Sequence, residues 1–519
     1  NRSFTIRVIV CLFCISPSFQ NMEIYPSKSE FIRLSCESIR VPICGEDTVP
    51  HLPIDEFFDY LYGDSKNAFL LESAGEIDLN AKYVIMGLGT PPFISIPNIG
   101  NSPNQQSDVK EWKSNANKQL CRLNFSNKIK SFDYLSHFWG GWVGFFSYEM
   151  GHFFEDLPTP SKDELGLPFL YFMTVENLWV YDRESGVLKY LVSNELGDES
   201  SESIFDENVD KINKAWGLIK KFHKWNKNNK ERNDSKTENK SFSPPINLRS
   251  NFSQNNYQDI VKRAKNYIQE GDIYQANLAQ RFSIDYAKDS LSLYRKLKMI
   301  NPSPFSSYFN FESFSIVSSS PERLLKINGN HLETRPIAGT RPRGKDFVQD
   351  NKLSAELLLN EKELAEHLML VDLERNDMGR VCEYGSVEVT DLMFLEKYSH
   401  VIHIVSNIIG KLSSKASVIE IIRALFPGGT ITGCPKIRCM EIINELETVQ
   451  RGPYSGSLGY IGFSQWVDLN IVIRTIIIKN GQAYFHVGAG IVADSIPEKE
   501  YIETLDKAAA MKKALGLEL

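Results

Sequence analysis

Two pairs of glutamates are the side chains in this sequence best suited to hold a cation. Glu363 and Glu366 stand three residues apart, and Glu500 and Glu503 repeat that spacing near the C-terminus. On a helix, residues three apart project from neighbouring points of one face. If the two pairs converge, they offer oxygen ligands to Mg²⁺, which binds through one or two carboxylates, water and substrate. Solvated surface glutamates are the alternative, and the spacing alone does not decide between them.

A glycine-rich basic segment, residues 426–438 (FPGGTITGCPKIR), has the composition of an anion-binding site. Its glycines permit close backbone approach, and it contains Thr430 and Lys436. It precedes an expected helix over residues 439–446, whose N-terminal amides would attract an anion. The spacing GxxxxGK[ST] is absent, so the segment is not a P-loop. A structural turn without a ligand is the alternative.

Further polar or glycine residues stand in apolar runs. Arg474 lies in the expected strand 470–478, where an arginine needs either a carboxylate ligand or an internal ion pair. His403 lies in an apolar stretch, as a core residue or as a general acid in a closed pocket. Gly488 and Gly490 offer backbone amides near a strand end, unless they form a plain turn. Together these residues indicate a site for a small polyanion bound with Mg²⁺.

The elements that must position these residues form a mixed α and β pattern. Short strand-like runs, such as residues 83–86 and 178–181, alternate with turns in the first half, and strong helices join the strands in the second half. Pro497 and Gly516 mark the expected start and end of the helix that carries the second glutamate pair. There is no regular βαβ alternation, so the pattern argues against a doubly wound sheet.

A polar tract divides the chain of 519 residues. Residues 224–250 are rich in Lys, Asn, Ser and Glu, a composition that cannot bury apolar surface, so a linker or loop is expected there. Residues 22–223 would form an N-terminal region and residues 251–519 a catalytic region. Residues 1–21 contain an apolar run that resembles a signal-peptide core but is too short to span a bilayer, and they are interpreted as an extension or leader.

Charge and cysteine content narrow the class of protein. The formal net charge of −7 gives no general support for nucleic-acid or anionic-membrane partners. The eight cysteines are scattered, and Cys11 and Cys14 form one lone CxxC with no second pair at zinc-ligand spacing. Such thiols suit a reducing environment, so a cytoplasmic location is expected.

The motifs resemble those of the chorismate-binding enzymes, which include anthranilate, aminodeoxychorismate, isochorismate and salicylate synthases. Nine blocks carry the resemblance in order: GDIYQANLAQRF (271–282), SSSPERLL (318–325), TRPIAGTRPRG (334–344), ELAEHLMLVDLERND (363–377), YSHVIHIVS (398–406), FPGGTITGCPKIR (426–438), RGPYSGSLGY (451–460), NIVIRT (470–475) and VGAGIVADSIPEKEYIET (487–504). The first half is similar to the same family through AFLLESA (68–74) and GGWVGFFSYE (140–149). The resemblance implies an α+β fold in which antiparallel β-sheets pack as a sandwich with helices outside.

The resemblance also implies residue roles. The four glutamates would surround Mg²⁺, with Glu366 and Glu503 as the preferred direct ligands, Glu500 beside them and Glu363 in the catalytic set. His403 would assist the departure of a ring hydroxyl. The other pocket residues implied are Arg474 and Tyr454 for substrate carboxylates, Gly488 and Gly490 for backbone amides, and Thr430, Lys436, Ala338 and Thr340 along the walls.

The motifs favour one reaction and leave a second open. Gln275 stands where hydrating members of the family carry a water-activating lysine, which implies an amine nucleophile. The blocks NLAQRF, PGGTITG and NPSPFSSYF (301–309, with Ser306 in place of a common Met) are similar to aminodeoxychorismate synthases and predict amination of chorismate at ring carbon 4, towards 4-aminobenzoate and folate. Ala338 points instead to anthranilate synthesis, because many aminodeoxychorismate synthases carry a covalent lysine there. A non-catalytic chorismate-binding subunit is the third alternative.

Two partners follow from the same resemblance. The sequence has no glutamine amidotransferase signature, so ammonia would come from a separate glutaminase subunit. The segment Leu70–Ser73 resembles the family's tryptophan pocket, which could hold a regulatory or structural tryptophan, although a packed strand is the alternative. The residues of that predicted pocket are Leu71, Glu72, Ser73, Pro304 and Phe305.

Overall fold

The structure is a computed structural model that describes residues 22–74, 82–98, 106–126, 128–132, 134–135, 137–158, 160–233, 247–397 and 401–517. The predicted leader, residues 1–21, lies outside these ranges, as do residues 234–246 of the predicted linker.

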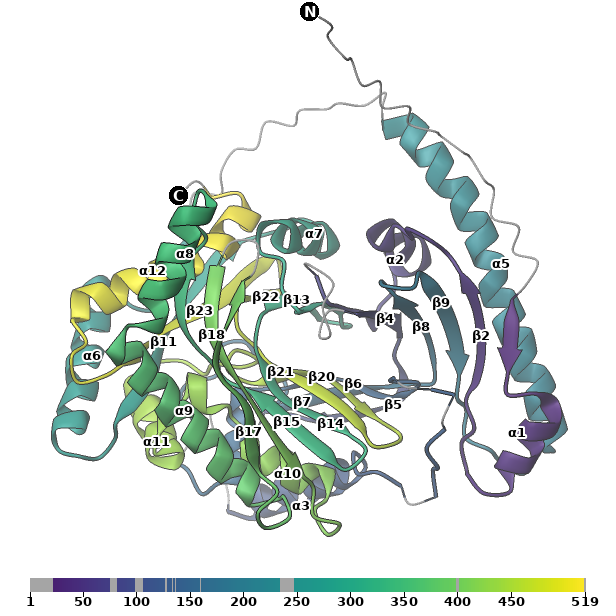
Figure 1. Ribbon diagram of the computed structural model, residues 1–519, viewed down its shortest axis with the longest axis horizontal. Coiled ribbons are helices and arrows are strands. Elements are labelled where there is room, and N and C mark those ends of the chain that lie inside the picture. The colour runs from purple at the N-terminus through teal and green to yellow at the C-terminus, as the bar shows by residue number, and fades with distance from the viewer. Residues whose placement is uncertain are drawn as a thin grey trace, which may run out of the picture.

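Two antiparallel sheets form the body of the molecule (Figure 1). The first has the order β1 (Glu23–Tyr25), β2 (Ile43–Thr48), β9 (Val187–Val192), β8 (Asn177–Asp182), β4 (Tyr83–Leu88), β3 (Ala68–Glu72), β12 (Phe305–Asn310), β13 (Phe314–Ser320), β22 (Thr475–Lys479), β23 (Gln482–Ile491), β11 (Gln275–Asp285) and β10 (Arg249–Ser250), with β19 (Gly433–Cys434) also on β11. The second has the order β16 (Ile337–Pro342), β18 (Val401–Lys411), β15 (His331–Arg335), β14 (Arg323–Asn328), β21 (Trp466–Ile471), β20 (Ser457–Gly462), β6 (Gly141–Phe146), β7 (Leu170–Val175) and β5 (Thr90–Ile96), with β17 (Glu388–Lys397) also on β18.

The helices cover the outer faces of these sheets. They are α1 (Lys28–Ser35), α2 (Ile54–Tyr62), α3 (Gln106–Cys121), α4 (Gly151–Phe154), α5 (Ser201–Asn233), α6 (Gln254–Gln269), α7 (Ser290–Ile300), α8 (Phe347–Leu358), α9 (Glu361–Gly379), α10 (Val418–Leu425), α11 (Lys436–Leu446) and α12 (Pro497–Leu515), with 3-10 turns η1 (Tyr148–Met150) and η2 (Gly429–Ile431). In Figure 1, α8, α9 and α12 lie at the opposite side of the molecule from α5, and α5 packs against β2 and β9. The predicted α+β sandwich with external helices is confirmed. None of the helices in the described ranges is long and apolar enough to cross a membrane.

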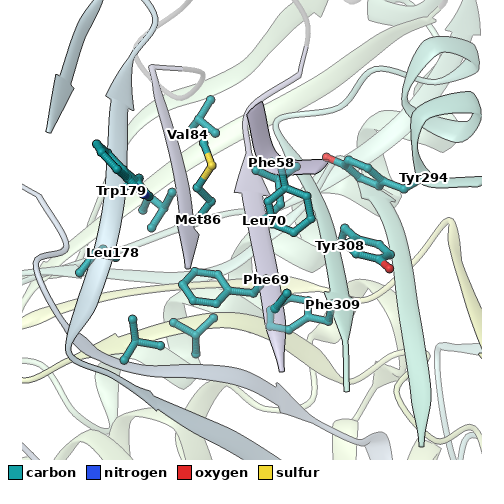
Figure 2. Packing of buried hydrophobic residues seen from close by; sticks show 14 of the residues in the cluster. Phe58, Phe69, Leu70, Val84, Met86, Leu178, Trp179, Tyr294, Tyr308 and Phe309 are labelled. Carbon is teal, nitrogen blue, oxygen red and sulfur yellow. The ribbon is translucent and has the colours of Figure 1, made fainter. Parts of the chain in front are cut away.

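Aromatic side chains fill the space between the sheets. The rings of Phe69 in β3 and Phe309 in β12 stack with centroids 6.3 Å apart, and Figure 2 shows them among buried neighbours. The ring centroids of Phe309 and Phe311 lie 5.3 Å apart, and those of Phe311 and Phe145 of the second sheet lie 5.7 Å apart. Such pairs contribute about 0.5–1.5 kcal/mol each beyond their buried area. They fix the separation of the two sheets on which the site is built.

The predicted N-terminal and catalytic regions share both sheets. Leu71 of β3 pairs with Ser307 of β12, and Gly144 of β6 pairs with Gly459 of β20. The boundary predicted from the polar tract therefore does not separate two sheets.

The prediction of a linker over residues 224–250 is wrong at both ends. Residues 224–233 continue α5, and residues 249–250 form β10. Helix α5 is anchored by the buried side chains of Ile212, Ile219 and Phe222. Once a helix is nucleated, each further residue adds a hydrogen bond, and Lys and Glu are good helix formers, so the polar sequence extends it.

The single strand predicted over residues 470–478 is also wrong. Strand β21 ends at Ile471 in the second sheet, and β22 begins at Thr475 in the first. Arg474 lies in the crossover between them, with a backbone φ of 49°. An apolar run that changes sheets has the same composition as one continuous buried strand, so the pattern could not reveal the break.

Both glutamate pairs lie on helices, and the helix of the second pair begins and ends close to where the sequence predicts. In α9, the side chain of Asn360 accepts a hydrogen bond from the backbone N–H of Glu363 at 3.1 Å. Helix α12 begins at Pro497 and ends at Leu515, and the capping residue Gly516 has a φ of 86°, the left-handed conformation that favours glycine.

Candidate active site

One half of the candidate site lies where α9 meets the first sheet. The Gln275 side-chain N–H donates to Glu366 Oε1 at 2.8 Å. Gly490 in β23 lies against both groups, because a Cβ added there would stand 2.7 Å from Gln275 Nε2 and 3.6 Å from Glu366 Oε1. The structure thus brings together a predicted metal ligand, the residue at the lysine position and a predicted amide donor.

The other half lies where α9 meets β16 and β18 of the second sheet. Thr340 Oγ1 is 2.9 Å from His403 Nδ1, and the Gly339 carbonyl oxygen is 3.4 Å from the same nitrogen. A Cβ added at Gly339, whose φ is 69°, would stand 2.3 Å from Glu363 Oε2. Glu363 also accepts a hydrogen bond from Arg341 at 2.6 Å. Helix α9 therefore connects its two glutamates to both sheets.

His403 is uncharged in this setting. It is 2% exposed, and burial, reinforced by the charge of Arg474, lowers its pKa to about 3. At neutral pH the ring is neutral, so it can form hydrogen bonds to a leaving hydroxyl but cannot serve as a cationic acid.

Glu322 is a group that reasoning from the sequence missed. It lies just before β14, is 5% exposed and accepts the backbone N–H of Ile337 at 3.4 Å. Burial and, to a smaller extent, repulsion from Glu374 raise its pKa to about 7, although Thr430 and Arg474 act in the opposite direction. A carboxyl that holds its proton near neutral pH is suited to proton transfer. The only signal in the sequence was a glutamate within the largely apolar and serine-rich block SSSPERLL.

A neutral polar wall stands on the β23 side. A Cβ added at Gly488 would lie 2.9 Å from Tyr454 Oη and 2.4 Å from Asn277 Oδ1. The Tyr454 ring stacks on His486 with centroids 5.2 Å apart, and burial raises the pKa of Tyr454 to about 12. Tyr454 therefore keeps its hydroxyl proton and can donate it to a carboxylate.

The second glutamate pair lies on α12, which packs against β23. Glu500 is 8% exposed, whereas Glu503 is half exposed and forms an ion pair with Lys507 at 2.8 Å. Lys507, which the sequence reasoning also missed, donates to the Gly488 carbonyl oxygen at 2.9 Å. The structure therefore places Glu366 beside Gly490 and links Glu503 to Gly488 through Lys507.

The donor chemistry of this set fits Mg²⁺, because every predicted ligand is a carboxylate oxygen. In the described part of the chain, Glu363 Oε2 is buried without a hydrogen-bond partner. No three His, Cys, Asp or Glu side chains among the described residues are gathered closely enough to form a metal-binding group as they stand. The magnesium assignment stays a prediction.

Two predicted pocket residues, Lys436 and Ala338, have their partners within the protein itself. Lys436 forms an ion pair with Asp377 and donates to the Leu425 carbonyl oxygen at 3.0 Å. Ala338 is 9% exposed on β16, opposite Ile404 of β18, and supplies no amine to the site.

A separate cavity of about 260 Å³ contains every residue of the predicted tryptophan pocket. Glu72 accepts hydrogen bonds from Tyr294 at 2.5 Å and from Lys298 at 2.6 Å, so its charge is matched. His137 also lines the cavity, with Nδ1 3.0 Å from the Phe138 carbonyl oxygen. Burial lowers the pKa of His137 to about 4, so its neutral Nε2 is an acceptor, and this atom has no hydrogen-bond partner among the described residues.

Comparisons with known proteins identify the family to which the chain is similar. The family model described as chorismate binding enzyme matches residues 89–513. A protein of Synechocystis named anthranilate synthase component I-like protein is 44% identical over 400 residues, which cover 76% of this chain and 77% of that protein. Aminodeoxychorismate synthase component 1 of Bacillus subtilis is 43% identical over 380 residues, covering 73% and 78%. The crystal structure of anthranilate synthase component I from Streptococcus pneumoniae matches with a TM-score of 0.65 and 29% identity, covering 85% of this chain and 93% of that one.

Proposed function

Because the chain belongs to the chorismate-binding enzymes, we propose that it is a synthase subunit that aminates chorismate with ammonia at ring carbon 4. The main support for an amine nucleophile is Gln275. Its neutral side-chain amide donates a hydrogen bond to Glu366 at the position where a water-activating base would stand. Its Oε1 is buried and has no hydrogen-bond partner among the described residues, so it can accept an N–H of ammonia. The product would be 4-amino-4-deoxychorismate, a precursor of 4-aminobenzoate.

A specific observation favours a second candidate. Ala338 is apolar and buried, so no lysine amine is available there for a covalent step. Anthranilate synthesis, with amination at carbon 2 and elimination of pyruvate, needs no such amine. Both reactions share the same first requirement, a leaving ring hydroxyl and an incoming ammonia.

In the proposed reaction Glu322 is the acid that protonates the leaving hydroxyl. The carbon–oxygen bond of the ring hydroxyl breaks, its oxygen takes the Glu322 proton and water leaves. Ammonia forms the new carbon–nitrogen bond and loses one proton, which returns to the Glu322 carboxylate. Neutral His403 orients the hydroxyl through a hydrogen bond, because its pKa of about 3 leaves it unable to supply a proton at neutral pH.

The remaining residues hold the two substrate carboxylates. Arg474 and the Tyr454 hydroxyl offer donors to one, and the backbone amides of β23 add fixed dipoles. Glu366, Glu500 and Glu503 would hold Mg²⁺, which, when bound, would neutralise the charge of a substrate carboxylate.

Two partners complete the proposal. The relatives named component I or component 1 suggest a second component, and we assign it the supply of ammonia from glutamine, in the cytoplasm. We assign tryptophan to the cavity, where His137 Nε2 would accept the indole N–H.

Product analysis tests the reaction. The purified protein is incubated with chorismate, Mg²⁺ and excess ammonium, with and without an aminodeoxychorismate lyase. A 4-aminobenzoate signal that requires the lyase supports amination at carbon 4. Anthranilate with released pyruvate would select the second candidate, and unchanged chorismate with saturable binding would select the non-catalytic alternative.

A further inference from the structure

Arg451 is a buried cation whose hydrogen-bonding capacity is fully used inside the protein. It is 1% exposed, and its Nε and Nη2 donate to Glu447 at 2.9 and 2.6 Å. Nη1 donates to the Ile431 carbonyl at 3.0 Å and the Ser455 hydroxyl at 3.1 Å, and Nη2 also donates to the Asn277 carbonyl at 2.7 Å. A guanidinium has five N–H donors, and these five bonds account for all of them.

The acceptors belong to three different parts of the candidate site. Ile431 directly follows Thr430, and Ser455 directly follows Tyr454. Asn277 lies in β11 opposite Gly490. Glu447, the ionic partner of Arg451, also accepts the backbone N–H of Ala279 at 2.8 Å, and Ala279 lies in β11 opposite Gly488. The ion pair of Arg451 and Glu447 thus connects the turn at Thr430, the turn at Tyr454 and the paired strands β11 and β23.

Charge and ring contacts keep this arrangement rigid. Burial alone would lower the pKa of Arg451, but the bidentate contact with Glu447 outweighs it and raises the pKa, so the guanidinium stays charged. It lies over the Tyr148 ring at 4.7 Å and the Tyr454 ring at 5.7 Å. Glu149 holds its backbone, accepting the Arg451 N–H at 2.7 Å.

We propose that Arg451 and Glu447 form a positioning pair that fixes the substrate-carboxylate wall, formed by the Tyr454 hydroxyl and the amides of Gly488 and Gly490. Arg451 itself binds no substrate, since no donor remains for one. The inference rests on the proposed function only in that the wall binds chorismate. Because the wall contacts the substrate carboxylates before and during reaction, its displacement weakens binding uniformly and raises KM while kcat changes little.

The test compares Arg451→Lys with Arg40→Lys. Lysine keeps the charge but offers three donors instead of five, so at least two of the five hydrogen bonds of Arg451 are lost. Arg40 is a matched control, 8% exposed and bonded to Glu176 at 2.7 Å, in the N-terminal region. Chorismate Kd is measured by calorimetry without ammonia, together with KM, kcat and melting temperature. We expect Kd and KM to rise on the order of tenfold or more in R451K, whereas R40K changes only the melting temperature.

The outcomes separate the two proposals. If the wild type binds no chorismate, the proposed function fails. If the wild type binds it and R451K binds it equally well, with only a lower melting temperature as in R40K, the positioning role is overturned. Should R451K not fold, Ser455→Ala removes one acceptor and leaves the ion pair intact. A severalfold rise in KM at unchanged melting temperature then supports the role, and an unchanged KM overturns it.

Discussion

The substitution Glu322→Gln tests whether a buried carboxyl supplies the proton in this site. Its pKa rises from 4.5 to about 7, and at about 1.4 kcal/mol for each pH unit this corresponds to about 3 kcal/mol. Between these values the unfolded chain has lost the proton that the folded protein still holds, so the free energy of unfolding falls as pH rises. Glutamine carries no such proton and removes this contribution.

Two assays follow from the same number. Urea unfolding of the wild type and E322Q should show the difference in unfolding free energy changing by about 3 kcal/mol in favour of E322Q between pH 4.5 and 7.5. Glu149 and Glu374, whose pKa values are also raised to about 7, are present in both proteins and contribute mainly equally. In turnover, kcat of the wild type should fall as pH rises through about 7, because the acid form is lost.

E322Q should lower kcat by roughly 10²–10⁴-fold at pH 6.5, the usual contribution of a positioned acid. The control is Glu312→Gln, which changes an exposed glutamate ten residues before Glu322 and leaves both pH profiles intact. A wild-type kcat that is flat from pH 6 to 8, or an E322Q variant that turns over normally, would refute the assignment of the acid.

Three further predictions concern the metal, the glycine contact and the second cavity. Glu366→Gln should abolish Mg²⁺-dependent turnover, while Glu361→Gln on the exposed side of the same helix leaves it unchanged; magnesium titration of the rate distinguishes them. Gly490→Ala places a Cβ 2.7 Å from Gln275 Nε2, so kcat/KM should fall on the order of 10²-fold with a preserved circular dichroism spectrum. His137→Phe removes an acceptor and should weaken tryptophan binding by about 1 kcal/mol, roughly fivefold, in calorimetry, without changing KM for chorismate.

Local chemistry in the sequence was sufficient where one segment determines its own structure. The spacing of Glu363 and Glu366, and the Pro497 start and Gly516 stop of the other helix, depend only on neighbours within a turn or two. The apolar runs of β4 and β8 likewise predicted strands that the structure contains. These features agree because intrinsic preference and tertiary context point the same way.

Long-range geometry was not accessible in this way. The crossover at Arg474 is visible only once β21 and β22 are known to belong to different sheets. The raised pKa of Glu322 depends on burial and on Glu374, which no local pattern reveals. The polar end of α5 shows the opposite case, in which a composition typical of a linker adopts a helix because its apolar start is anchored by packing.

The site also requires a region that supplies none of its proposed catalytic groups. Strand β3 stands between β4 and β12, and β6 stands between β7 and β20, so both sheets contain N-terminal strands in their interior. Removing residues 22–223 would expose the unpaired backbone edges of β12 and β20. It would also remove Glu149, which holds the backbone of Arg451 behind the substrate wall. Residues 251–519 alone should therefore neither fold stably nor bind chorismate, because the two halves of the site depend on sheets that the first half of the chain completes.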